Sequence, residues 1–348
     1  MKKTGLDADI NELNGGVPEK LLRKRTWIKV LGVILVIILL LSGSIVVYAN
    51  HFLNSINYVE CDFDSLKDVN IMEIVEELPE ERINEEYTVE KDEINWDIKD
   101  RDLIKNEKHV YNFLLCGVEA IGGGRGRTDA ILIATINEEQ KRLKLTSLMR
   151  DTYVYIEGHN NNKLNASYTL GGMALLQDTV EKNFDIKIDG YALVNFDGFK
   201  AIIDRLGGVE IELTKEEADY LNSTNYIADE RYRNVVPGKQ IMNGEQALGY
   251  SRVRHVKTKN KLQGDFGRNY RQRVLLQSIF NKYKSKNIVE ILTILPDLLK
   301  LVTTDLDKMD IIKYATMALQ LDVSEIETYR VPSEGTYKNA MINKRFVL

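Results

Sequence analysis

An uncharged run, residues 30–49, constrains this chain more than any other feature of its sequence. The run is rich in Val, Ile and Leu, and about twenty apolar residues at a rise of 1.5 Å each cross the roughly 30 Å hydrocarbon core of a bilayer. We therefore predict one transmembrane helix over residues 30–49. A cleaved signal peptide is the alternative, but its apolar core is usually only about 7–15 residues long.

Basic residues stand just before this run and indicate its direction: Lys20, Arg23, Lys24, Arg25 and Lys29. Positively charged flanks stay on the cytoplasmic side of a membrane. The sequence thus predicts a single-pass protein of the cell membrane, with residues 1–29 as a cytoplasmic tail and the main domain extracellular. Membrane lipid is then an expected partner.

Composition limits the kinds of structure that the rest of the chain can form. The 348 residues leave room for one large domain with accessories, and the net charge of -5 argues against a nucleic-acid partner. Residues 50–108 are heavily acidic, which favours an extracellular stalk or adapter, most simply a solvated spacer. Two cysteines cannot form a disulfide framework, and Cys116 lies in an apolar run where burial is expected.

Residues 109–348 alternate between strand-like and helix-like patterns, which is typical of a layered α/β domain. The predicted strands cover residues 111–118, 130–136, 143–149, 192–196, 209–213 and 327–331. The predicted helices cover residues 175–184, 199–206, 270–283, 288–302 and 309–321. Residues 246–254 change from a helix-like to a strand-like pattern. The expected fold is a three-layer α/β/α domain with a mixed central sheet, preceded by one transmembrane helix.

Charged residues stand where the predicted strands begin or end, and α/β folds commonly place their sites there. These residues are Glu119, Arg127, Asp129, Arg150 and Asp151. Any single one of them could equally form a surface salt bridge. The glycine run 122–124 resembles a phosphate loop but lacks the Gly-Lys-Ser/Thr that follows in nucleotide-binding loops, so a flexible turn is preferred.

A second group of cations lies further along the chain. If residues 250–254 form a strand, Arg252 and Arg254 point to the same face. At helical spacing Arg268, Arg271 and Gln272 share a face near a helix start, where free backbone N–H groups favour anions. These residues together predict a clamp for a diphosphate. Carboxylates such as Glu119 and Asp129 would supply oxygen ligands for the Mg²⁺ that phosphates recruit.

These segments resemble the LytR-CpsA-Psr family of cell-wall glycopolymer ligases. The resemblance covers residues 110–285, in order and without a missing block. Its motifs are Arg127-Thr128-Asp129, Leu145 to Val154, Lys163 to Tyr168 with Gly171-Gly172, Val194 to Phe199, Leu206 to Val209, Asn243 to Arg254, and Asp265 to Gln272.

The resemblance implies a phosphotransferase that moves a glycopolymer phosphate from a polyprenyl diphosphate carrier to peptidoglycan, with Mg²⁺ or Mn²⁺ as cofactor. Asp129 and Glu119 would hold the metal, and Arg150 would support cleavage. The diphosphate-binding residues would be Arg127, Lys163, Arg252, Arg254, Arg268, Arg271 and Gln272. Two positions depart from the family pattern: Glu119 stands where Asp is usual, and Met149 stands where proline is frequent.

The chemistry expected of such a site is phosphoryl transfer, with metal and arginines neutralising charge on the diphosphate. Asp151 or Glu119 could deprotonate the acceptor hydroxyl. The sequence leaves two alternatives open. One is a hydrolase that acts on the same polyprenyl diphosphate with water as acceptor, and the other is a non-enzymatic, membrane-bound lipid-binding regulator.

Overall fold

The structure, a computed structural model, describes residues 57–61, 94, 96, 98, 104, 106–119, 126–286, 288–321, 323, 325–342 and 345–348. The chain divides into two compact units, 1–54 and 55–348, and every described residue belongs to the second. The predicted tail 1–29, the apolar run 30–49 and the glycine run 122–124 lie outside the described residues. Among the helices that the structure describes, none is long and apolar enough to cross a membrane.

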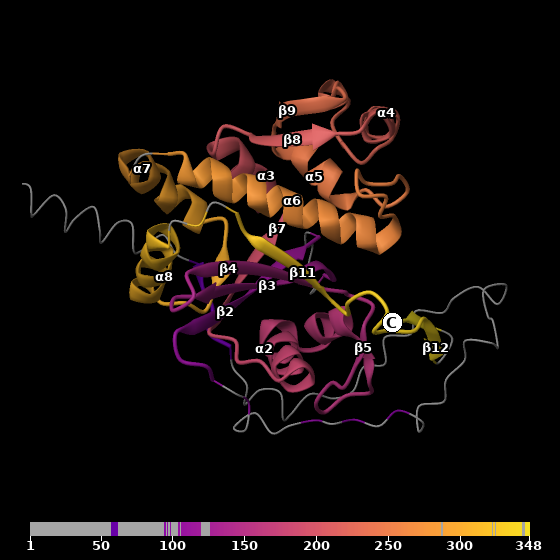
Figure 1. Cartoon of the computed structure of the whole chain (residues 1–348), viewed down its shortest axis with the longest axis vertical. Helices are drawn as coiled ribbons and strands as arrows, with labels where there is room; N and C mark the ends of the chain where they lie inside the picture. Colours follow the sequence, from indigo (N-terminus) through magenta and orange to yellow (C-terminus); the bar gives the residue numbers. More distant parts are fainter. Residues whose placement is uncertain are drawn as a thin grey trace, which may run out of the picture. The chain divides into compact units, whose positions relative to one another are not determined.

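A seven-stranded mixed sheet forms the centre of the domain, in the order β1-β10-β7-β2-β3-β4-β11 (Figure 1). Strand β2 runs parallel to β7 and antiparallel to β3, β3 is antiparallel to β4, and β4 is parallel to β11. The bounds are β1 (Asn57–Tyr58), β2 (Val110–Val118), β3 (Thr128–Asn137), β4 (Arg142–Leu148), β7 (Gly190–Asn195), β10 (Thr303–Thr304) and β11 (Glu327–Val331).

Alternation along β2 explains why both faces of this sheet are covered. Leu114 and Cys116 are buried in the cluster that contains the apolar residues of helix α2 (Leu164–Phe184). Phe113 directly precedes Leu114 and points to the opposite face of the sheet. It belongs to a cluster with residues of α6 (Gly264–Lys284) and α8 (Lys308–Gln320). Successive strand residues point to opposite faces, so a strand with apolar residues at both parities needs helices on both sides.

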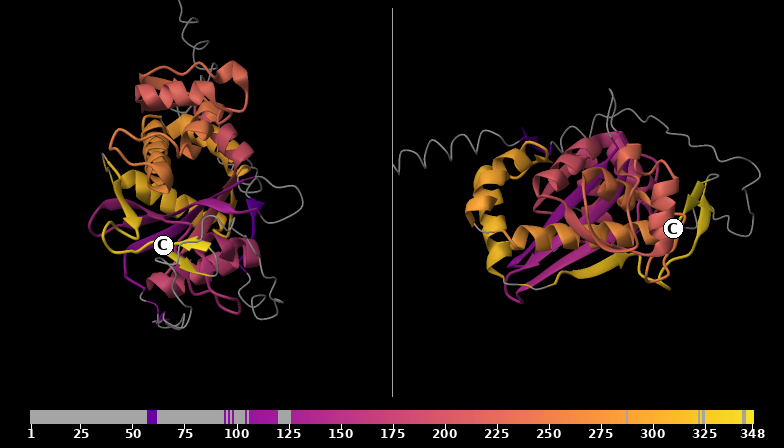
Figure 2. Two further views of the ribbon diagram at one scale, coloured as in Figure 1. Left: turned by 90° about the vertical axis from the view of Figure 1, so that its right-hand side faces the viewer. Right: turned by 90° about the horizontal axis from the view of Figure 1, so that it is seen from above.

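The layers follow from this pattern, and Figure 2 shows the sheet between α2 on one side and the orange helices on the other. The second helical layer also contains α3 (Phe196–Arg205), α5 (Gly244–Arg252) and α7 (Ile288–Leu299). Outside it lie α4 (Lys215–Ser223), the short helix η6 (Glu230–Tyr232) and the hairpin of β8 (Val209–Leu213) with β9 (Gly238–Met242). Two small pairs complete the domain: β5 (Tyr153–Val154) with β6 (Asn162–Lys163), and β12 (Ala340–Ile342) with β13 (Arg345–Val347).

The predicted α/β/α architecture with a mixed sheet is confirmed for the described residues, and the burial of Cys116 is confirmed as well. Residues 246–254 were predicted to change from helix to strand: the helical part is confirmed, and the strand at its end is wrong. Asn243 caps a helix there, accepting from the Gln246 N–H while the Gln246 side chain accepts from the Asn243 N–H. This reciprocal cap starts α5, which ends at Arg252.

The segment predicted as a stalk, residues 50–108, contributes to the domain at several described points. Asn57–Tyr58 form the edge strand β1 and pair in parallel with β10. Ile104 is buried. The sequence pattern predicts that the domain begins at residue 109. The structure shows that it begins well before that residue.

Candidate active site

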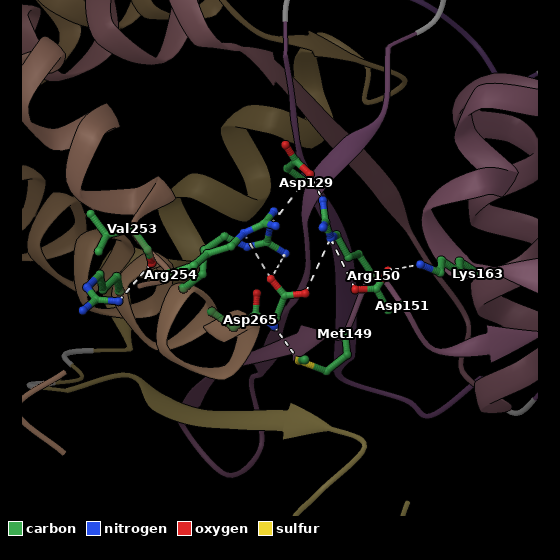
Figure 3. A network of polar contacts seen from close by, with 11 residues as sticks. Asp129, Met149, Arg150, Asp151, Lys163, Val253, Arg254 and Asp265 are labelled. Atoms are coloured by element: carbon green, nitrogen blue, oxygen red, sulfur yellow. Dashed lines mark hydrogen bonds and ion pairs between the residues drawn. The ribbon is translucent and has the colours of Figure 1, made fainter. Parts of the chain in front are cut away.

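Asp129 and Arg150 form the centre of a polar network at one end of the sheet (Figure 3). Asp129 has no cross-strand partner, because Gly117 pairs with Ala130 while Val118 pairs with Thr128. This β-bulge inserts one residue and re-aims its side chain. The Asp129 carboxylate accepts a hydrogen bond from a terminal nitrogen of Arg150.

Arg150 and Asp151 occupy the turn after β4, and backbone bonds to the start of α2 fix that turn. The Asn165 N–H donates to the Arg150 carbonyl at 3.1 Å, and the Leu164 N–H donates to the Thr152 carbonyl at 2.8 Å. Lys163, the residue before α2, places its Nζ 3.1 Å from Asp151 Oδ1. The local chain path therefore holds Arg150, Asp151 and Lys163 together.

Asp265 lies in the first turn of α6 and joins three arginines in one network. Its carboxylate is 3.2 Å from Arg254 Nε, 3.3 Å from a terminal nitrogen of Arg268 and 3.8 Å from Arg150 Nε. The Gly264 N–H donates to the Arg254 carbonyl at 2.9 Å, which fixes Arg254 beside the helix start. Sequence analysis missed Asp265 as a site residue, although its place in the Asp265 to Gln272 motif was the available signal.

The carboxyl groups of Asp151 and Asp265 are neighbours, and their pKa values are shifted in opposite directions. Burial raises the pKa of Asp265, and its hydrogen bond with Asp151 adds to the rise, outweighing Arg150 and Arg254. Burial also disfavours the charged form of Asp151, but the bond from Asp265 and the charges of Lys163 and Arg150 outweigh it and lower its pKa. Asp151 is therefore the more acidic of the two carboxyl groups.

Arg268 is the least expected member of the network, because its guanidinium is charged, buried and without a hydrogen bond. Its side chain is 2% exposed, and its three guanidinium nitrogens make no hydrogen bond with any described residue. Only ion-pair contacts at 3.3 Å to Asp265 and 3.9 Å to Asp129 compensate its charge. One turn further on, Gln272 Oε1 is also buried without a partner. Buried polar atoms in this state are suited to receive a ligand.

An apolar cavity of about 380 Å³ opens beside these groups, between the sheet and helices α3, α5 and α6. Asp129, Arg268 and Gln272 contribute to its wall, as do Arg252 and Arg254. The rest of the lining is mainly apolar and includes Leu115, Leu132, Val194, Phe199, Leu248 and Leu275. The cavity thus combines an apolar interior with a cluster of cations, as an amphiphilic anion requires.

Three predicted site residues lie at the margin of this network or outside it. Arg252 stacks over Phe196 at 5.0 Å and contacts Glu119 at 3.8 Å, with side-chain exposures of 40% and 63%. Arg127 is exposed at the start of β3. Arg252 and Arg254 are brought to one cavity, but by a helix end followed by an extended residue, Val253, and not by a shared strand.

Arg271 points away from the cavity, so its place in the predicted diphosphate clamp is wrong. Its side chain is fully buried and pairs with Glu217 at 2.8 Å. It also donates to the carbonyls of Val253 at 3.0 Å and Val256 at 2.9 Å. Positions three residues apart on a helix are neighbours but not equivalent, and here Arg268 faces the cavity while Arg271 faces the α4–α5 side.

The described residues contain no group of three or more His, Cys, Asp or Glu side chains that could hold a metal ion. Asp129, with a side-chain exposure of 29%, offers one carboxylate at the cavity wall. Mg²⁺ in phosphate sites is commonly held by one or two carboxylates together with substrate oxygens. The donor set therefore fits a metal that arrives with a diphosphate.

The model of the LytR_cpsA_psr family matches residues 70–346. The chain belongs to this family.

Curated relatives in the family carry a transferase name. One from Enterococcus faecalis, polyisoprenyl-teichoic acid–peptidoglycan teichoic acid transferase TagU, is 37% identical over 60% of this chain and 66% of its own length. The Bacillus subtilis TagU is 34% identical over 53% of this chain and 56% of its own length. The chain thus matches between about half and two thirds of the length of these relatives.

Solved structures of family members share the fold. One is TagT, described as YwtF with bound octaprenyl pyrophosphate lipid. It has a TM-score of 0.53 and 23% identity, over 71% of this chain and 87% of that chain. At this identity the similarity shows the fold alone, so the arrangement of this chain's own residues must carry any statement about its ligand.

Proposed function

We propose that this protein is a phosphotransferase of cell-wall assembly, which moves a glycopolymer phosphate from a polyprenyl diphosphate carrier to peptidoglycan. The observation that carries the proposal is Arg268, a buried guanidinium without hydrogen bonds in the wall of an apolar cavity. A polyprenyl chain would fill the apolar space, and the diphosphate would supply acceptors for Arg268. The transferase names of the relatives support the same reaction class.

In this proposal the cations bind and orient the diphosphate. Arg254 and Arg268 donate to its oxygens, the side-chain N–H of Gln272 donates to them as well, and Arg252 at the cavity wall assists. A guanidinium grips two oxygens at once, so bidentate contacts orient the phosphates as well as attract them. Arg150 is paired with Asp129, a residue of the cavity wall, and would exchange that carboxylate for a phosphate oxygen.

In the proposed transfer step, one charged residue accepts a proton and another stabilises the leaving group. The acceptor hydroxyl of peptidoglycan attacks the phosphorus that carries the glycan, and its proton passes to the carboxylate of Asp151, which lies beside Arg150 and Lys163. The P–O bond to the carrier breaks, and polyprenyl phosphate leaves with the electron pair. Arg150 stabilises the charge that develops on this leaving group.

A divalent metal fits the proposal at one position. Asp129 would hold Mg²⁺ or Mn²⁺ together with diphosphate oxygens, and the bound ion would neutralise phosphate charge. Glu119 contacts Arg252 at 3.8 Å, and its role as a second ligand stays a prediction.

The topology is also part of the proposal. The apolar run 30–49 would anchor the chain in the cell membrane, with residues 1–29 inside and the described domain outside, where peptidoglycan is assembled. We expect a cysteine introduced as Asn160→Cys, an exposed site, in a Cys61→Ser background, to react with an impermeant thiol reagent on intact cells. Reaction only after lysis would contradict the extracellular placement.

The activity test uses the full chain in detergent micelles with a polyprenyl diphosphate-linked glycan and peptidoglycan fragments. We expect mass spectrometry to detect a glycan–phosphate–peptidoglycan product together with polyprenyl phosphate. Arg268→Gln should abolish both, while Arg142→Gln, which alters an exposed ion pair on β4, should leave them unchanged.

Equal release of polyprenyl phosphate with and without peptidoglycan, and no linked product, would instead indicate a hydrolase. Binding of the lipid without any turnover would indicate the regulatory role.

A further inference from the structure

Arg273 and Arg330 form a second pair of cations, outside the Asp129–Arg150–Asp265 network. Arg273 reaches from α6 to the sheet and donates to Ser147 Oγ at 2.8 Å. Ser147 lies in β4 opposite Arg330 of β11 in the parallel register. Residues opposite each other in neighbouring strands point to the same face, so Arg330 and Ser147 both face α6. The two arginines therefore meet between α6 and the β4–β11 edge of the sheet, which Figure 1 shows lying side by side.

This pair has no counter-charge among the described residues. No Asp or Glu that the structure describes lies within ion-pair distance of either guanidinium, whereas Arg142 of β4 pairs with Glu327 of β11 at 3.5 Å. Arg330 uses its Nε for the Pro332 carbonyl at 3.1 Å and lies over the Phe266 ring at 4.2 Å. Burial, with the charge of Arg330, lowers the pKa of Arg273 to about 10. Both side chains are half-buried, so water screens their repulsion only in part.

The pair lies close to the proposed reaction centre. Ser147 lies near the end of β4 and precedes Arg150, in the turn that follows, by three residues, so their Cα atoms are at most roughly 10 Å apart. Phe266, which packs under Arg330, follows Asp265 directly in α6. The two cation groups are thus neighbours, joined through the end of β4 and the first turn of α6.

We propose that Arg273 and Arg330 bind a phosphate group of the glycopolymer itself, separate from the diphosphate that links it to the carrier. This inference rests on the proposed function, and it names the substrate class: a glycan with a phosphodiester within the first few sugars of the carrier. Two guanidiniums without carboxylate partners match the charge and geometry of one phosphate. Ser147 holds Arg273 in place and can remain its partner when the anion binds.

The test compares two synthetic donors on the same polyprenyl diphosphate, one with a phosphodiester-containing oligosaccharide and one with a neutral oligosaccharide of equal length. Binding to the full chain in detergent is measured by calorimetric titration for the wild type, Arg273→Gln and Arg330→Gln. Each variant should bind the phosphodiester donor about tenfold or more weakly, the loss of one charge-assisted contact, and should bind the neutral donor unchanged. The control Arg142→Gln should match the wild type with both donors.

The outcomes separate this inference from the proposed function. If the wild type binds both donors and the two variants bind both equally well, the second anion site is refuted and the diphosphate site stands. If the wild type binds neither donor, both proposals fail. A purely structural role of Arg273 would show as a lower melting temperature in Arg273→Gln and also in Ser147→Ala, with no discrimination between donors. We expect instead that removing one of two repelling charges leaves the melting temperature of the free protein unchanged or raises it.

Discussion

Arg268 and Arg271 stand three residues apart on α6, and the structure predicts opposite consequences for the same substitution at each. In Arg271→Gln the carboxylate of Glu217, which is 2% exposed, loses its charged partner. The carbonyls of Val253 and Val256 lose donors as well. In Arg268→Gln no hydrogen bond to a described residue is lost, because none of them bonds to that guanidinium in the free protein.

The magnitude is set by the burial of the Arg271–Glu217 pair. Removing one partner of a buried ion pair costs about 3–5 kcal/mol, because the remaining charge is uncompensated. For a domain of this size each kcal/mol lowers the melting temperature by roughly 2–4 °C, so Arg271→Gln should melt roughly 6–20 °C below the wild type. The double variant Arg271→Gln/Glu217→Gln should recover part of this loss, since it removes the orphaned charge.

The assay is thermal melting of the full chain in detergent, with and without a short-chain polyprenyl diphosphate. A ligand at about 100 times its Kd should stabilise the wild type by about 2.7 kcal/mol, and Arg271→Gln should show a comparable upward shift from its lower baseline. Arg268→Gln should keep the wild-type baseline and lose the shift. If Arg268→Gln melts as early as Arg271→Gln, or if both retain the ligand shift, the division of labour derived from their contacts is refuted.

Two further predictions concern the carboxylates. Asp129→Asn should reduce transfer at least tenfold and weaken its dependence on Mg²⁺, while the free energy of unfolding falls by at most about 1 kcal/mol, because the Asp129–Arg150 pair is partly exposed. A loss as large as that for Leu132→Ala, a core truncation of about 2–5 kcal/mol, would assign Asp129 a structural role. Asp265 has a raised pKa, so its contribution to stability is complete below the unfolded value of about 3.9 and is lost as the pH rises through the folded pKa. Melting of Asp265→Asn from pH 4 to pH 7 should therefore improve relative to the wild type as the pH rises, and a relative decline would contradict the raised pKa.

The sequence predicted the central strands well, because β2, β3 and β4 are short, largely apolar runs. The segment 246–254 failed for a local reason. Its strand-like end, Tyr250 to Arg254, is read from alternating side chains, but the capping box at Asn243 commits the chain to a helix that continues through Arg252. A nine-residue helix gives too little periodicity to be distinguished from a strand, whereas its cap was visible in the sequence.

The sequence predicted which residues form the candidate site better than it predicted the role of each residue. Arg150, Asp129 and Lys163 are indicated by strand ends and motifs, and the structure brings them together. The direction of Arg271 depends on Glu217, which lies on a helix fifty-four residues away in sequence. The β-bulge that turns Asp129 towards Arg150 is likewise a property of the pairing of two strands. Neither can be obtained from the spacing of one segment.

The partners of the site arginines in the free protein suggest how binding and catalysis are divided between them. Arg268 must break no hydrogen bond to receive a phosphate, so its full interaction is available for binding the donor. In the proposed reaction Arg150 must first release Asp129. This exchange lowers the free energy only when a stronger negative charge develops beside Arg150. An interaction that strengthens between the ground state and the transition state raises kcat, whereas one that is equal in both lowers KM. Arg268 should therefore act mainly on affinity for the carrier diphosphate, and Arg150 mainly on the rate at which polyprenyl phosphate leaves.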